Sequence, residues 1–168
     1  FDRSGWAPNY DPNLSTSGGQ PPGVFSHNVY IDWNNTDVTF RDNISMRAAN
    51  NGVMIRSGGF LQDNVVMDAN SAIVISGGEF EGTGMVGNFT LASGNVITSA
   101  GHHASRVTGF LSQGFENAGN DTTLIDNIIA HLADPNNLAE IRSKTTINAA
   151  LSNKHDPFYN DTIIYNWK

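Results

Sequence analysis

A short unit, in which apolar residues lead into Asp-Asn followed by Ile or Val, recurs along this chain. The unit occurs at residues 38–44, 60–65 and 123–128, and its asparagines are Asn43, Asn64 and Asn127. The first interval between these asparagines is about 21 residues, and the second is three times as long. Each run of strand-forming residues is only about four to six residues long and ends in Asn, Gly or Asp, which form turns.

A second motif repeats with nearly the same spacing. Residues 51–59 and 71–78 both contain an alternating apolar run that ends in Ser-Gly-Gly, and the two copies are in phase with the Asp-Asn units. This period predicts a parallel β-solenoid, because one coil cannot bury its inward face alone whereas stacked coils form one continuous core. Asn residues at matching corners are expected to form a hydrogen-bonded ladder. An antiparallel sandwich has strands every roughly 8–12 residues, but it does not require Asp-Asn units in phase.

The expected fold class is therefore all-β, with about 21 residues per coil and lateral loops. Parallel strands are expected near residues 28–32, 38–41, 44–47, 53–56, 60–62, 65–67, 73–75 and 124–130, with Asn43 and Asn64 at equivalent corners. Alternation along these strands predicts the inward residues to be Val29, Ile31, Ile44, Val53, Ile55, Val65, Ile73, Ile75 and Ile128.

Length and composition limit the remaining possibilities. We expect residues 1–168 to be a single β-helix domain or a fragment of a longer one, with residues 1–26 as an irregular, Pro- and Gly-containing loop excursion. The first residue is Phe1 rather than Met, which indicates a processed or partial chain. The net charge of −7 argues against nucleic-acid and membrane partners. Without cysteine, the chain can form neither a disulfide nor a thiolate zinc site.

The repeats resemble a known family. The Asp-Asn turns, the lead-in at residues 27–30 and the closing residues 56–59 are similar to right-handed parallel β-helix proteins of the secreted bacterial and phage carbohydrate-active type. The likeness covers about residues 27–130. It implies a right-handed coil, a polysaccharide partner bound along an elongated sheet face, an extracellular or cell-surface location, and a homo-oligomer if the protein is a phage spike. Because many functions use this fold, the resemblance indicates architecture better than activity.

A polyuronate lyase needs a group that neutralises a carboxylate, a base for the sugar C5 proton and an acid for the leaving oxygen. If the strands before Asp32, Arg56 and Ser76 are equivalent, these residues stack in one row, and Tyr30 shares their outward face. The candidate catalytic residues are therefore His27, Tyr30 and Arg56. The candidate substrate-binding residues are Asp32, Trp33 and Arg47, and no metal ligand is assigned, although turn oxygens leave Ca²⁺ open.

Structural roles are the alternatives for the same residues. Arg56 and Asp32 could instead form a surface ion pair, which contributes roughly 0–1 kcal/mol to stability. At the entry of a strand, residues such as His27 and Tyr30 commonly cap the turn or cover the core, and Trp33 could plug a loop instead of stacking on a sugar. Three functions follow: a lyase or epimerase acting on an acidic, uronic-acid polysaccharide; a non-catalytic carbohydrate-binding tailspike or adhesin; and a structural surface or filament β-helix.

Overall fold

The computed structural model describes the greater part of the repeated region and short segments around it. The described residues are 1–2, 26–48, 50–69, 71–76, 78–79, 85–86, 89–98, 113–119, 121–130, 135–139, 141, 151–153 and 162–164. Most of the expected excursion at residues 1–26 therefore lies outside the described residues.

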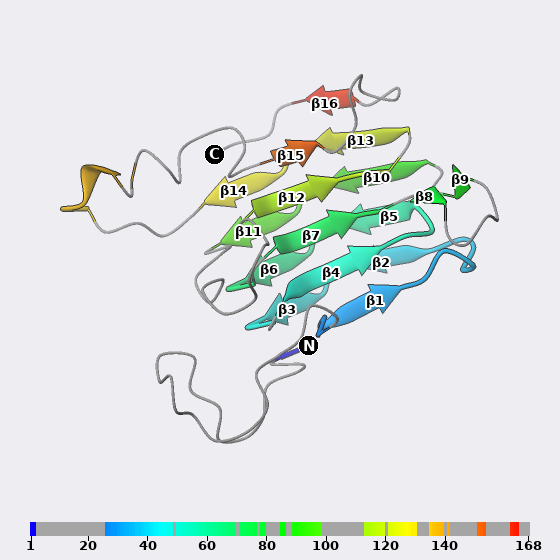
Figure 1. Cartoon of the computed structure of the whole chain (residues 1–168), viewed down its shortest axis with the longest axis horizontal. Helices are drawn as coiled ribbons and strands as arrows, with labels where there is room; N and C mark the ends of the chain where they lie inside the picture. The colour runs from blue at the N-terminus through cyan, green and yellow to red at the C-terminus, as the bar shows by residue number, and fades with distance from the viewer. Residues whose placement is uncertain are drawn as a thin grey trace.

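The described strands form three parallel sheets (Figure 1). Sheet 1 has the order β1 (Val29–Ile31), β4 (Asn51–Ile55), β7 (Ser71–Ile75), β12 (Gln113–Asn117) and β15 (Leu151–Asn153). Sheet 2 has the order β2 (Thr39–Arg41), β5 (Gly59–Gln62), β10 (Thr90–Ser93), β13 (Thr122–Ile125) and β16 (Thr162–Ile164). Sheet 3 has the order β3 (Ile44–Met46), β6 (Val65–Met67), β11 (Val96–Thr98) and β14 (Ile128–Ala130). A short antiparallel pair, β8 (Gly78–Glu79) with β9 (Met85–Val86), stands apart from them.

The chain visits the three sheets in turn, so each coil contributes one strand to each sheet, as in a right-handed parallel β-helix. Phe40 of the first coil pairs with Leu61 of the second. The corner asparagines of these coils, Asn43 and Asn64, bond to each other across 21 residues, which confirms the predicted coil length. The next two steps, from Asn64 to Asn95 and from Asn95 to Asn127, are 31 and 32 residues. The interval between Asn64 and Asn127 thus holds two coils lengthened by insertions, not the three expected from the period.

A buried asparagine ladder connects the coils. The Nδ2 amide of Asn64 donates to Oδ1 of Asn95 at 2.9 Å, Asn95 donates in the same way to Asn127 at 2.9 Å, and Asn43 donates to Asn64 at 3.3 Å. Backbone carbonyls accept the second amide hydrogen; for Asn64, the acceptor is Phe40 O at 2.9 Å. Because the buried amides find partners, the ladder stabilises the stack. The predicted equivalence of Asn43 and Asn64 is confirmed.

The corner before each ladder asparagine requires left-handed backbone. Asp42, Asp63 and Asp126 have φ of 58°, 54° and 54°, and Gly94 has φ of 66° at the equivalent position. Asp tolerates this region better than most residues, and Gly adopts it without steric cost. These angles explain why the repeated unit carries Asp-Asn or Gly-Asn at this point.

The inward residues of sheet 1 were predicted correctly. Val53, Ile55, Ile73 and Ile75 are buried in the core, while Val29 and Ile31 pack against it at the first coil. Along β1 and β4 these residues alternate with the less buried Tyr30 and Met54, as the pattern indicated, whereas all five residues of β7 are buried.

The inward residues of sheet 3 were predicted wrongly, by one position. Ile44 and Ile128 are 52% and 46% exposed, and Val65 is only half-buried and faces outward. The ladder asparagine itself occupies the inward position, so alternation places the second residue after it in the core. Those inward residues are Ser45, Val66, Ile97 and Ile129.

The single strand expected at residues 124–130 is in fact two strands, β13 and β14, separated by the turn at Asp126 and Asn127.

Candidate functional site

The outer face of sheet 1 presents two rows of side chains from successive coils. Register places Tyr30, Met54, Val74 and Glu116 in one row, in which Tyr30 is exposed, Met54 and Glu116 are half-buried and Val74 is buried. The second row lies just past the paired strand ends, where the amides of Arg56, Ser76 and Ala118 donate to the carbonyls of Ile31, Ile55 and Ile75 at 2.9, 2.8 and 2.7 Å. Asp32 follows Ile31 on the first coil. The structure thus places Asp32, Arg56 and Ser76 along one line.

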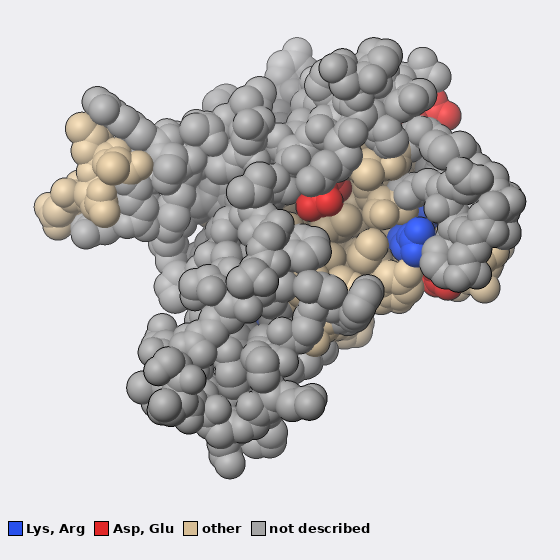
Figure 2. All heavy atoms as spheres, viewed as in Figure 1, with Lys and Arg blue, Asp and Glu red and all other residues tan. Residues whose placement is uncertain are grey.

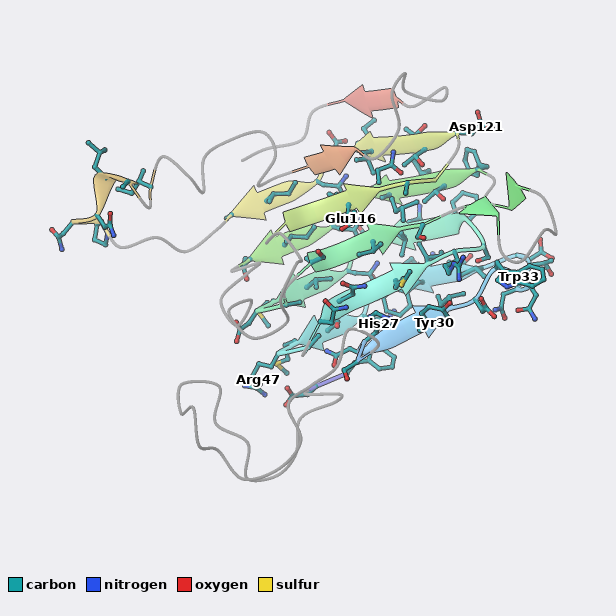
Figure 3. All side chains as sticks on the ribbon, in the orientation of Figure 1. His27, Tyr30, Trp33, Arg47, Glu116 and Asp121 are labelled. Atoms are coloured by element: carbon teal, nitrogen blue, oxygen red, sulfur yellow. The ribbon has the colours of Figure 1, made fainter. Side chains whose placement is uncertain are left out.

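Tyr30 lies at the centre of a cluster formed by the first two coils. Arg56 Nη1 donates a hydrogen bond to the Tyr30 hydroxyl oxygen at 3.2 Å, and that hydroxyl donates to Asp32 Oδ1 at 3.4 Å. The His27 ring stacks on the Tyr30 ring, with centroids 5.6 Å apart and planes 16° from parallel. Tyr30 is 47% exposed, so the cluster opens to solvent. Figure 3 shows His27 and Tyr30 side by side at β1.

The surroundings of His27 change how readily its imidazole is protonated. Burial lowers the pKa of His27 below its ordinary value because it disfavours the charged imidazolium. Within the described part of the chain, its buried Nδ1 atom has no hydrogen-bond partner. The ring is therefore neutral at pH 7 and able to accept a proton.

Asp32 and Trp33 lie at the margin of the cluster. Asp32 Oδ1 accepts a hydrogen bond from the Trp33 backbone amide at 2.8 Å, and the Asp32 carbonyl accepts one from Asn35 Nδ2 at 2.9 Å. The Asp32 carboxylate therefore helps to form the turn after β1 as well as contacting Tyr30. Trp33 lies beyond the end of β1, away from His27 (Figure 3).

Arg47 lies apart from the other candidates, at the turn after β3 in sheet 3 (Figure 3). Its Nε donates to Asp2 Oδ1 at 2.8 Å, and its second nitrogen forms an ion pair with the same carboxylate. The hydrogen bond to Asp2, together with the charges of Asp2 and Asp68, raises the pKa of the Arg47 guanidinium. Asp2 also pairs with Met46 as an isolated parallel bridge, so Arg47 helps to hold the first residues against β3.

Sequence reasoning missed Glu116, which lies on the outer face of β12 (Figure 3). Its neighbours Phe115 and Asn117 are buried, so alternation directs the Glu116 side chain outward. The same alternation is readable in the sequence, but the coil containing it follows an insertion that interrupts the period. Without the register, nothing places Glu116 on the face that carries Tyr30 and Arg56.

No family model matches the chain, and neither the curated proteins nor the solved structures include a significant match. In the part of the chain that the structure describes, no group of three or more His, Asp or Glu side chains could hold a metal ion. Nor does any helix in that part have the length and apolar character needed to cross a bilayer.

Proposed function

We propose that this protein binds an acidic, uronic-acid polysaccharide along the outer face of sheet 1 and cleaves it by β-elimination. The observation that carries the proposal is the hydrogen bond from Arg56 to the Tyr30 hydroxyl at 3.2 Å, with the His27 ring stacked on the same tyrosine. A cation, a hydroxyl and a neutral imidazole from two successive coils thereby meet on one exposed surface. These are the three kinds of group that β-elimination from a uronate needs.

Each group has a specific role in the proposed reaction. Arg56 pairs with the uronate carboxylate, because a guanidinium matches carboxylate geometry, and it stabilises the negative charge that develops as the C5 proton leaves. The His27 imidazole accepts that proton. The electrons of the C5–H bond form the C4–C5 double bond, the C4–O bond breaks, and Tyr30 donates its proton to the leaving oxygen. Proton return from His27 to Tyr30 restores the resting state.

The rest of the face supplies binding surface. The half-buried Met54 continues the row beside Tyr30, so the floor next to the cluster is apolar, whereas Val74 on the following coil is buried. We assign Asp32 and Trp33 to sugar contacts at the margin, as a hydrogen-bond acceptor and an aromatic surface. Arg47 is left out of the proposed site because it pairs with Asp2 in sheet 3.

A non-catalytic carbohydrate-binding role is the second candidate. One observation favours it: the Tyr30 hydroxyl already lies between Arg56 and Asp32, at 3.2 and 3.4 Å. Such a network holds side chains rigid for recognition without requiring any proton transfer. In this case the stack acts as a stiff rod and the same face binds sugar.

To test the proposal, the protein is incubated with a panel of uronic-acid polymers. Cleavage is followed by the ultraviolet absorbance of unsaturated products, and binding to the same polymers is measured in parallel. The wild-type protein should produce absorbance with at least one polymer. Tyr30→Phe should lower the rate by about 10²–10⁴-fold, as expected for loss of an acid–base group. Thr39→Ala, at an exposed position of sheet 2, should leave the rate unchanged. Binding without absorbance would leave the carbohydrate-binding role, and the absence of both would contradict the proposal.

A further inference from the structure

The two ring nitrogens of His27 are not interchangeable in the proposed reaction. Nδ1 is buried and, within the described part of the chain, has no hydrogen-bond partner. A buried nitrogen cannot reach a sugar bound on the surface, so only Nε2 can accept the C5 proton. A neutral imidazole carries a single proton, and the nitrogen that lacks it is the acceptor. His27 can therefore act as the base only if its proton lies on Nδ1, where an acceptor inside the protein must bind it.

Asn51, the first residue of β4, lies opposite His27 on the next coil. Its carbonyl oxygen accepts a hydrogen bond from the Asn28 amide at 3.1 Å. In the register of β1 with β4, Val29 pairs with Val53, which brings together the residues two positions earlier on each coil. Neighbouring strands lie about 4.8 Å apart, so the side chains of His27 and Asn51 begin one strand spacing from each other.

Equivalent contacts on the two coils place both side chains on the outer side of sheet 1. The His27 ring stacks on Tyr30, three residues further along the chain. The Asn51 Nδ2 atom donates to Met54 Sδ at 3.7 Å, again three residues further along. Tyr30 and Met54 are themselves register partners on that side of the sheet. The Asn51 carboxamide and the His27 ring are therefore neighbours on successive coils.

Asn51 offers the acceptor that His27 needs. Asn51 is 4% exposed, and its Oδ1 atom, like Nδ1 of His27, is buried without a hydrogen-bond partner among the described residues. A buried polar atom left unpaired costs about 1–3 kcal/mol, so one bond between the two atoms removes two such costs. Hydrogen bonds that orient a catalytic group are often long without substrate and shorten when it binds.

The acidic side chain of the cluster is engaged elsewhere. Asp32 Oδ1 accepts hydrogen bonds from the Tyr30 hydroxyl and the Trp33 amide. Figure 2 shows only scattered acidic side chains among the described residues on this side of the molecule. A neutral amide also orients the ring without favouring the imidazolium, as a carboxylate would. The ring can then stay neutral and accept a proton.

We propose that Asn51 is the positioning residue of His27: its Oδ1 accepts the Nδ1 proton and holds the imidazole in the tautomer whose Nε2 is the base. This inference rests on the proposed function and says how its base is oriented. When Nε2 takes the C5 proton, the other proton stays on Nδ1, and its bond to Asn51 strengthens because the donor becomes charged. Asn51 itself is buried and touches no substrate.

Nuclear magnetic resonance reports the tautomer directly. Long-range correlation spectra of isotope-labelled protein at pH 7.5 show which ring nitrogen carries the proton, and the His27 signals are those missing from His27→Gln. The wild type should have the proton on Nδ1. Asn51→Leu, which removes the acceptor, should move it to Nε2, whereas Asn51→Asp, which keeps an oxygen, should leave it on Nδ1. Ser71→Ala is the matched control and should change nothing, because Ser71 is the register partner of Asn51 on the side away from β1.

The rate of cleavage of uronic-acid polymers gives a second readout. Asn51→Leu should lower kcat by about 10²-fold with KM nearly unchanged, because a base in the wrong tautomer loses much of the roughly 10²–10⁴-fold that an acid–base group contributes. Asn51→Asp should recover most of that loss.

A proton on Nε2 in the wild type, or a tautomer that Asn51→Leu does not change, would overturn the assignment, and a cleaving enzyme would then need another base. A proton on Nδ1 that depends on Asn51, in a protein that cleaves no uronic-acid polymer, would support the bond between His27 and Asn51 and contradict the proposed function. If Asn51→Leu does not fold, Asn51→Asp decides. Its carboxylate should raise the pKa of His27, and an unchanged pKa would overturn the assignment.

Discussion

Two rows of side chains run along this stack, and they differ in composition. The inner row is one residue type repeated, with Asn43, Asn64, Asn95 and Asn127 bonded to each other. The outer row of sheet 1 has a different residue on every coil, namely Tyr30, Met54, Val74 and Glu116. Repetition serves the fold, because every coil makes the same corner. The fold does not require a different residue at each equivalent position of the outer row. Such variation is therefore more readily explained by function.

The largest effect is expected when a charge is placed on the inward and on the outward side of the coil. Ile55→Asp puts an unpaired carboxylate into the core, which costs several kcal/mol, and should prevent folding. Ile44→Asp, at a position 52% exposed, should fold and lose no more than about 1 kcal/mol. Expression and thermal melting of the two variants measure the difference. A soluble, cooperatively melting Ile55→Asp protein would show that the inward register is misplaced.

The ladder gives the next largest effect. Asn95→Ala removes a buried amide and leaves the partners at Asn64 and Asn127 unsatisfied, so the free energy of unfolding should fall by about 3–5 kcal/mol. Asn43→Ala, at the half-buried first rung, should cost clearly less. Denaturant titration with a common m-value gives both numbers. Equal losses at the two positions would mean that the rungs do not act as a connected ladder.

The smallest effect concerns His27 and pH. Burial lowers the folded-state pKa of His27, so the unfolded chain binds a proton more readily than the folded one. The resulting contribution to stability is complete above the unfolded pKa of about 6.5 and is lost as the pH falls through the folded value. The melting temperature of the wild type should therefore fall more steeply than that of His27→Gln between pH 7.5 and pH 5. Parallel curves for the two proteins would refute a buried, neutral His27.

The sequence predicted the parallel coil, its 21-residue repeat and the ladder pair Asn43–Asn64, because these follow from the spacing of one turn motif. It failed at Ile44 and Ile128, because the inward direction of the ladder asparagine is set by stacked coils and not by local alternation. The sequence also predicted three coils between Asn64 and Asn127 where there are two. Insertions lengthen the chain between equivalent strands but leave the pairing of those strands unchanged.

The candidate site shows the same division. The shared face of Tyr30 and Arg56 was predictable from two neighbouring coils of nearly regular length. The position of Glu116 on this face was not predictable from the sequence, because its coil follows an insertion. Only the pairing of β12 with β7 shows where Glu116 lies. Arg47 is alone among the six candidates in lying on another sheet, where it pairs with a residue 45 positions away.

If the outer face of sheet 1 binds a ligand while the asparagine ladder holds the fold, one sample of Arg56→Ala should separate the two roles. Binding of a uronic-acid polymer and the melting temperature are measured on that same preparation. We expect the affinity to fall by about 1.5–3 kcal/mol, the size of a charge-assisted hydrogen bond, while stability changes by no more than about 1 kcal/mol. Unchanged binding with a small loss of stability would contradict this division of roles and reduce Arg56 to a surface partner of Tyr30.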